Sequence, residues 1–271
     1  MLAHASKATV SVQSLAAFVE HLQRQGRYTF DRTEALAALA VSEAALKQAA
    51  LRLVKKGVLV APRRGFFVIV PSEYRDAGAP PPAWYIDSLM RFQAQPYYVG
   101  LVSAAALHGA AHHAAQEFHV VTSAPLRPTQ VARSLLRFFV RHDVEDVPVI
   151  ETKTPTGTMR VSTPEATALD LVRYPHGAGD ASVPTLLAAL VPKLRAGRLV
   201  GIASRNEPRY VQRLGALLSR VGGKKLTVGL ARLVERLDPP EVLLRPDRPS
   251  DGARRDRRWR VLMNAAIEVD T

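Results

Sequence analysis

The amino-acid sequence predicts an α+β protein: an N-terminal winged helix-turn-helix followed by a larger mixed α/β C-terminal domain. Residues 1–70 show, in order, two amphipathic helical segments, a tight turn, a third helical segment and a hairpin pattern. Residues 71–83 contain four prolines and mostly small side chains, as a linker does. Beyond them, helical and strand-like patterns alternate over residues 84–271. We therefore expect a DNA-binding domain at 1–70, a linker at 71–83 and a second domain at 84–271.

The helices of the first domain are predicted from apolar spacing and from capping residues. Apolar residues between positions 15 and 22 recur at three- and four-residue intervals, the spacing of a buried helix face, and Gly26 ends this helix. Asp31 is placed to cap a short second helix. Ser42 is placed to cap a third helix that runs to Lys56.

Positive charge is densest at this N-terminal end of the sequence. The chain has 37 Lys and Arg against 24 Asp and Glu, a net charge of +13. Ten of those cations, against four acids, lie in the first 70 residues. A basic domain favours a polyanionic partner, and nucleic acid is the leading candidate.

The outward face of the third helix and the tip of the hairpin carry the residues that we expect to contact DNA. Gln48 is placed to bond an adenine edge and Lys47 or Arg52 a guanine edge, while cations further along contact phosphates. The β-rich runs at 58–60 and 66–70 form a hairpin whose arginines reach a minor groove or phosphates. The predicted DNA-binding residues are Ser42, Lys47, Gln48, Arg52, Lys55, Arg63 and Arg64.

The second domain is predicted to alternate helices and strands and then to become mainly helical. Strands are expected at 117–122, 137–141, 147–152 and 160–162, the last leading into a helix capped by Ser162 or Thr163. Helices are expected at 84–95, 103–107, 186–199, 209–221 and 226–237. Residues 246–258, rich in Pro, Asp and Arg, are expected to be mobile, and 259–263 to return as an edge strand.

Composition excludes several classes of protein. The absence of cysteine excludes disulfides, Cys-type zinc sites, thiolate nucleophiles and iron–sulfur clusters. No apolar run approaches the ~18 residues of a membrane helix, and residues 1–12 lack the apolar stretch of a secretory signal. We expect a cytoplasmic protein that uses no metal and no cofactor.

Two groups of residues nevertheless have the spacing of metal-dependent chemistry. Histidines gather at positions 108, 112, 113 and 119, and His108 and His112 have helical metal-pair spacing, although Gly109 separates them. Glu151 and Lys153 follow a strand-like run, as the carboxylate and lysine of magnesium-dependent nucleases do. The nearest preceding acids, at 143, 145 and 146, are too close in sequence to supply a companion ligand comfortably, so a solvated strand end is favoured.

Three sequence blocks beyond the linker carry a family resemblance. They are Ser-Ala-Ala-x-x-His-Gly at 103–109, Ser-Thr-Pro-Glu-x-Thr-x-x-Asp at 162–170 and Arg-Leu-Gly at 213–215. With the wing sequence Arg-Arg-Gly-Phe-Phe-Val, they make residues 10–220 similar to the AbiEi family of antitoxins and transcriptional regulators. The matched residues of the second domain are Ser103, His108, Gly109, Glu165, Asp170 and Arg213.

The resemblance implies a two-domain repressor whose winged helix binds inverted repeats in its own promoter. It also implies that the second domain adds DNA contacts and antagonises a partner nucleotidyltransferase toxin, either directly or indirectly, in a phage-defence system. The resemblance implies no catalysis by this chain. The Arg-rich segment 254–258 is not covered by the resemblance.

The matched residues of the second domain have scaffold explanations. We expect His108 to bond a backbone group before the turn, and Glu165 to form a capping box with Ser162. Asp170 is expected to pair with Arg213.

The leading interpretation is a DNA-binding autorepressor and antitoxin, and two alternatives stay open. One is a magnesium-dependent nuclease that uses Glu151 and Lys153. The other is a ligand-responsive repressor whose second domain binds a small molecule and which has no toxin partner.

Overall fold

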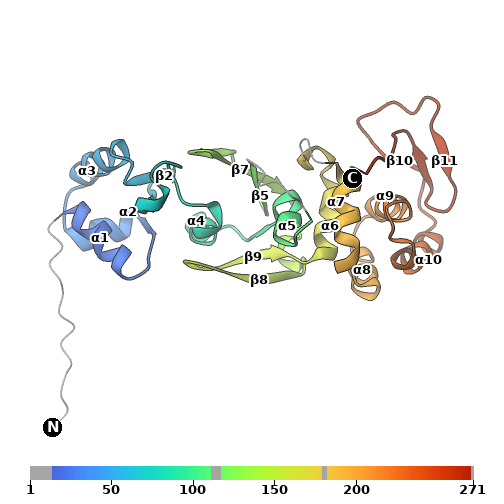
Figure 1. The fold of residues 1–271 in the computed structure, drawn as a ribbon, viewed down its shortest axis with the longest axis horizontal. Coiled ribbons are helices and arrows are strands. Elements are labelled where there is room, and N and C mark those ends of the chain that lie inside the picture. The colour runs from blue at the N-terminus through green and yellow to red at the C-terminus, as the bar shows by residue number, and fades with distance from the viewer. Residues whose placement is uncertain (1–13, 111–116, 179–181, 270–271) are drawn as a thin grey trace, which may run out of the picture. The chain divides into compact units, whose positions relative to one another are not determined.

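The computed structural model describes residues 14–110, 117–178 and 182–269 of the chain, and these have the expected mixed α+β fold (Figure 1). The described chain divides into two compact units. Unit 1 runs to Ala94 and includes Thr129–Leu135 and Thr154–Gly157, while unit 2 contains the remaining described residues. Within these ranges no helix combines the length and the hydrophobicity that crossing a bilayer requires.

Unit 1 begins with three helices and a three-stranded antiparallel sheet, which confirms the predicted winged helix-turn-helix. The helices are α1 (Leu15–Arg24), α2 (Arg32–Leu39) and α3 (Glu43–Lys55). The sheet has the order β1 (Thr29–Asp31), β3 (Phe66–Ile69) and β2 (Leu59–Arg63). The strand β1 was not predicted, because three residues are too few to show an alternating pattern.

Local capping explains where these helices begin and why α2 and α3 lie so close in sequence. The side chains of Asp31 and Ser42 accept hydrogen bonds from the backbone N–H groups of Glu34 and Ala45, as predicted for N-caps. Ala40 ends α2 in the left-handed conformation, with φ of 51°. The chain therefore turns within three residues before α3 begins.

Residues 71–94 contain more structure than the expected linker. They form two 3₁₀ helices, η1 (Ser72–Tyr74) and η2 (Pro82–Trp84), followed by α4 (Ile86–Phe92). The ring of Trp84 packs edge-on against Tyr28 and Tyr74, with centroids 5.2 Å apart in each pair. Phe92 packs against Phe66 of β3 with the rings tilted by 40° and their centroids 5.3 Å apart. Unit 1 thus extends past residue 83 because aromatic side chains pack this segment onto the winged helix.

The larger, mixed sheet has the order β6-β7-β5-β4-β9-β8, and most of its strand residues belong to unit 2. The strands are β4 (Tyr97–Val99), β5 (Glu117–Thr122), β6 (Thr129–Val131), β7 (Ser134–Val140), β8 (Val149–Thr154) and β9 (Gly157–Ser162). Central β4 runs antiparallel to β5 and parallel to β9. This short strand was not predicted, although all three of its residues are buried.

The helices of unit 2 surround α6 (Pro164–Arg173), which packs against α5, α7, α8 and α9. Their bounds are α5 (Leu101–Leu107), α7 (Val183–Leu190), α8 (Ala196–Ala203), α9 (Pro208–Leu218) and α10 (Thr227–Leu237), with 3₁₀ turns η3 (Val144–Asp146), η4 (Pro175–Ala178), η5 (Val191–Lys193) and η6 (Lys224–Leu226). The single helix expected at 186–199 is wrong: η5, which contains Pro192, separates α7 from α8.

A second, three-stranded sheet closes the C-terminal end of unit 2 (Figure 1). Its order is β10 (Val242–Leu243), β12 (Val261–Met263) and β11 (Arg254–Asp256). The prediction of an edge strand at 259–263 is therefore wrong, because β12 pairs on both sides. Trp259 just before it is 1% exposed, and its Nε1 donates to Ser219 Oγ at 2.9 Å.

Candidate functional site

The first candidate site is the solvent face of α3 in unit 1. Leu46 and Ala50 bury the opposite face of this helix, at 2% and 5% exposure. Packing therefore directs the polar side chains outward, and Lys47, Gln48, Arg52 and Lys55 are all exposed. The structure thus brings the four predicted DNA-contacting residues of this helix to solvent on one element.

The charges near the start of α3 are arranged so that its cations are not neutralised. The acid of its first turn, Glu43, bonds Arg32 of α2, with Oε2 and Nη1 3.1 Å apart. Leu51 lies among the polar residues and is 52% exposed. A cationic face that includes an exposed leucine has the chemistry to contact phosphates, base edges and a thymine methyl group.

The hairpin between β2 and β3 carries the two predicted wing arginines, and they differ in environment. The turn is made by Arg64 and Gly65, and Gly65 adopts φ of +85°. Arg64 is exposed. Arg63 is only partly exposed, donates to the hydroxyl of Thr129 within unit 1, and has a pKa lowered by burial. Arg64 is therefore the more accessible cation of the wing.

In unit 2, the first motif block holds the end of α5 to neighbouring strands. Ser103 Oγ accepts from the backbone N–H of His119 at 2.9 Å. His108 Nε2 lies 2.8 Å from the carbonyl oxygen of Ser162, so this nitrogen carries the proton and donates. Burial lowers the pKa of His108, which keeps the ring neutral. Gly109 follows with φ of +70°. The predicted backbone bond of His108 is confirmed.

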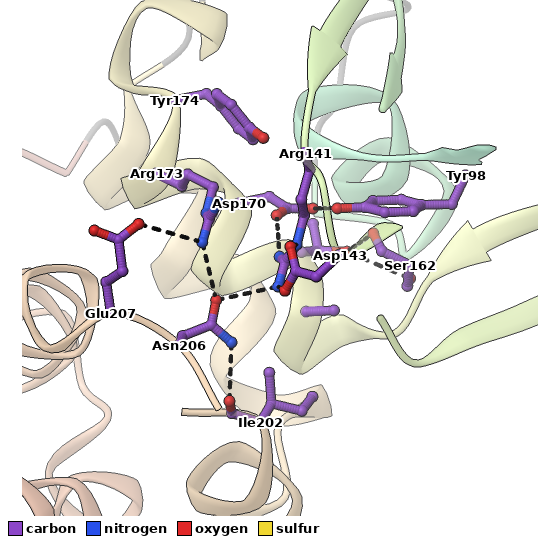
Figure 2. Close-up of polar contacts among 12 residues, drawn as sticks. Tyr98, Arg141, Asp143, Ser162, Asp170, Arg173, Tyr174, Ile202, Asn206 and Glu207 are labelled. Carbon is purple, nitrogen blue, oxygen red and sulfur yellow. Dashed lines mark hydrogen bonds and ion pairs between the residues drawn. The ribbon is translucent and has the colours of Figure 1, made fainter. Parts of the chain in front are cut away.

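A buried polar network lies behind the second block (Figure 2). Asp170 on α6 is fully buried, and its Oδ2 accepts from Tyr98 Oη at 2.9 Å. Its Oδ1 lies 3.4 Å from Arg141 Nη1. Arg141, 4% exposed, also donates through Nε and Nη2 to both oxygens of Asp143, at 2.7 and 2.8 Å. Two carboxylates therefore share one buried guanidinium.

The network continues to the connection between α8 and α9 (Figure 2). Asn206 Oδ1 accepts from Arg141 at 3.2 Å and from Arg173 at 3.4 Å, and its Nδ2 donates to the carbonyl of Ile202 at 2.9 Å. Arg173 also lies 4.0 Å from Glu207. The network thus joins the sheet, α6 and the α8–α9 connection.

Burial sets the protonation behaviour of this network. It raises the pKa of Asp170 to about 6, although Arg141 and Tyr98 oppose the shift. The hydrogen bonds from Arg141 lower the pKa of Asp143. Asp170 is therefore the acid of this network that titrates closest to neutral pH.

Two roles expected for the motif residues are wrong. Asp170 does not pair with Arg213, whose Nε donates instead to the carbonyl of Leu243 at 2.9 Å. Glu165 forms no capping box, because Thr163 caps α6 and Glu165 Oε1 accepts from the backbone N–H of Arg195 at 2.9 Å. Glu165 thus joins α6 to Arg195, and Arg213 joins α9 to Leu243. Sequence spacing does not reveal these contacts between distant segments.

The third block holds the C-terminal segment onto α9. Gln212 Nε2 donates to the carbonyls of Pro240 and Arg260, at 2.9 and 3.1 Å. A Cβ on Gly215 would lie 2.1 Å from the Trp259 ring, so only glycine fits there. This block therefore has a structural role.

The residues proposed for metal chemistry do not converge. Glu151 and Lys153 are exposed on β8, while the nearby acid Asp143 is bonded to Arg141. His119 bonds Glu117 at 3.0 Å, and His112 and His113 lie outside the described residues. Among the residues that can be placed, no three His, Asp or Glu side chains gather closely enough to hold a metal ion.

Comparison with known proteins adds a domain match and a fold. Residues 98–220 match the sequence model of the AbiEi antitoxin C-terminal domain. The structure is similar to the crystal structure of the RV2827C protein from Mycobacterium tuberculosis, with a TM-score of 0.67 and 16% identity over 90% of this chain and 89% of that one. At this identity the likeness concerns the fold alone. Comparison with curated proteins finds no match.

Proposed function

Because residues 98–220 carry the AbiEi antitoxin C-terminal domain, we propose that the chain is a DNA-binding autorepressor and antitoxin that opposes a cognate nucleotidyltransferase toxin. The resemblance seen in the three motif blocks is confirmed for this part of the chain. The family implies a cognate toxin, and unit 1 supplies the features from which we argue DNA binding. In this proposal the chain itself is not an enzyme.

The observation that carries the DNA-binding proposal is the exposed polar face of α3. Lys47 and Gln48 stand in the first half of the helix, and Arg52 and Lys55 in its second half. In helix-turn-helix proteins, residues near the start of the recognition helix reach base edges while others contact phosphates. Arg64 at the wing tip adds a cation for a groove or backbone contact.

Substitutions on α3 test this assignment. We expect Gln48→Ala to weaken binding to the promoter of the chain's own operon by about 1–3 kcal/mol, with smaller loss on random DNA, because a base-edge contact is lost. Gln25→Ala, an exposed glutamine at the end of α1, is the matched control. Fluorescence anisotropy on both DNAs measures the difference. Equal losses on both DNAs would contradict a base-reading role for Gln48.

Salt dependence tests the electrostatic part of the proposal. If about six to eight cations of unit 1 contact phosphates, log K against log salt should slope at about −5 to −7. Arg64→Ala should make the slope shallower by about one, because one phosphate contact is lost. A slope near zero would contradict phosphate contacts by this unit.

Cell rescue separates the antitoxin role from repression and from the nuclease alternative. We expect Gln48→Ala to lose repression and to keep protection against the co-expressed toxin, because α3 lies in unit 1 and most of the matched antitoxin domain lies in unit 2. Glu151→Ala and Lys153→Ala should both protect fully. A folded Glu151→Ala protein that binds DNA normally yet fails to protect would favour the nuclease instead.

A further inference from the structure

Unit 2 contains a pocket of about 440 Å³ whose lining includes no residue of α3 or of the buried network. Leu171 and Val172 of α6, Leu217 of α9 and Leu244 after β10 form an apolar wall, each at most 6% exposed. The volume falls within the range of small-molecule sites, roughly 300–1,000 Å³. The pocket therefore has the size and the apolar wall to take a small organic molecule.

Arg213 gives this pocket its polar character. The residue lines the pocket and is 9% exposed. Its Nε is held by the carbonyl of Leu243 at 2.9 Å, while its two terminal nitrogens bond no described residue. Within the described parts of the chain, no carboxylate lies within ion-pair distance of it. Burial lowers the pKa of Arg213; the Tyr210 phenol opposes this shift, and the nearby Arg209 adds to it.

A buried cation without a counterion is costly, so Arg213 is placed where an anion would relieve that cost. A guanidinium whose Nε is fixed presents its remaining N–H groups in one direction. This geometry suits the two oxygens of a carboxylate or a phosphate. The apolar wall beside it suits an uncharged body attached to that head group.

Other lining groups reinforce the preference for an anion. Ser182 caps α7, so the positive end of that helix dipole borders the pocket. Arg248 and His176 are exposed at the rim. Arg245 is occupied by Asp247, at 2.7 Å, and the exposed Glu268 is the acid of the lining. The lining thus has more cationic than anionic groups.

We propose that this pocket binds a small organic anion, with a carboxylate or phosphate head group at Arg213 and an apolar body against Leu171, Leu217 and Leu244. The proposal goes beyond DNA binding and toxin antagonism, because it gives unit 2 a ligand of its own. A ligand that binds only the folded state also stabilises it by mass action. Binding and thermal stability are therefore linked readouts.

Calorimetric titration of the full-length protein tests the proposal with defined probes. Phenyl phosphate and benzoate carry the two head groups on the same body, benzyl alcohol carries the body alone, and inorganic phosphate is a head group alone. We expect saturable binding of one or both organic anions, a rise in Tm with each that binds, and at least about tenfold weaker binding of the other two probes. The tighter organic anion identifies the preferred head group.

Variants locate the binding at Arg213. Arg213→Gln keeps a donor for Leu243 and removes the charge, so it should weaken the organic anion at least about tenfold. Arg232→Gln, at an exposed arginine on α10 outside the lining, should stay within about twofold. Ala266→Trp keeps Arg213 and fills the mouth of the pocket, so it should also weaken binding of the organic anion. This variant tests the site if Arg213→Gln fails to fold.

Three results would overturn the proposal. One is failure of both organic anions to bind at about 10 mM. Another is benzyl alcohol binding as tightly as benzoate, which would remove any role for the charge. The last is unchanged anion affinity in folded Arg213→Gln or in Ala266→Trp.

Discussion

The polar residues of α3 and those around α6 are of the same chemical types, but their environments are opposite. On α3, Lys47, Gln48 and Arg52 stand in solvent and touch no buried acid. Around α6, Asp170 and Arg141 are buried and bonded to each other. Exposed charges cost the fold little and stay available to a partner, whereas buried charges commit to one arrangement. The buried network residues of unit 2 therefore support its fold, whereas the exposed residues of α3 stay available to a partner.

The largest expected effect comes from breaking the buried pair. Arg141→Met leaves Asp170 and Asp143 without their guanidinium and should lower the free energy of unfolding by about 3–5 kcal/mol. Arg137→Met, a 39%-exposed arginine on β7 paired with Glu117, is the matched control and should cost about 1 kcal/mol or less. Urea unfolding of both proteins measures the difference. Equal costs would remove the contrast between buried and exposed charges.

A glycine comparison extends the contrast to packing. Gly215→Ala pushes a methyl group into the Trp259 ring and should destabilise by about 3 kcal/mol. Gly201→Ala on α8 meets nothing within 4 Å and should stabilise by about 0.5–1 kcal/mol, because alanine favours the helix. Thermal unfolding distinguishes the two signs. A neutral Gly215→Ala would contradict the close approach of Trp259.

The pH dependence of stability sharpens the description of Asp170. Burial raises its pKa from 3.8 to about 6, so the folded protein binds this proton more tightly than the unfolded chain does. The contribution of Asp170 is therefore most favourable below about pH 4 and decreases as pH rises through about 6. Relative to Asp170→Asn, the wild type should lose on the order of 2 kcal/mol between pH 4 and pH 7. A pH-independent difference in unfolding free energy would contradict the raised pKa.

The smallest expected effects belong to α3. Lys47→Ala and Lys55→Ala should each change the free energy of unfolding by less than about 0.5 kcal/mol, because both side chains are exposed. Both substitutions should nevertheless weaken binding to DNA. Arg141→Met, in contrast, is expected to lower the free energy of unfolding. Chemical denaturation and DNA titration of the same preparations test this pair of outcomes. A Lys47→Ala protein that unfolds more easily would show that α3 contributes to the core.

The winged helix was predictable because its signals are local. Asp31 and Ser42 cap helices within three residues, and the apolar spacing of α1 lies within one element. Strands β1 and β4 were missed, since three residues show no period. Their positions depend on neighbours far along the chain.

The buried network was not predictable for a related reason. The partners of Asp170 are Tyr98 and Arg141, 72 and 29 residues away. Nothing in the local sequence distinguishes Arg141 from Arg213 as a partner, because both are basic residues in apolar surroundings. A buried Asp in an apolar helix did signal that a cation must lie near, and only the fold identifies which one.

The packing of Trp259 against Gly215 has a consequence for how the protein is made. The ring and strand β12 complete the core over α9, yet Trp259 leaves the ribosome 44 residues after Gly215. Until those residues emerge, the Trp259 ring cannot pack on Gly215 of α9. Gln212 also lacks the carbonyl of Arg260 that accepts its hydrogen bond. Unit 2 therefore finishes folding only after Trp259 has emerged, and a chain terminated before that residue would carry a finished winged helix without a finished second unit.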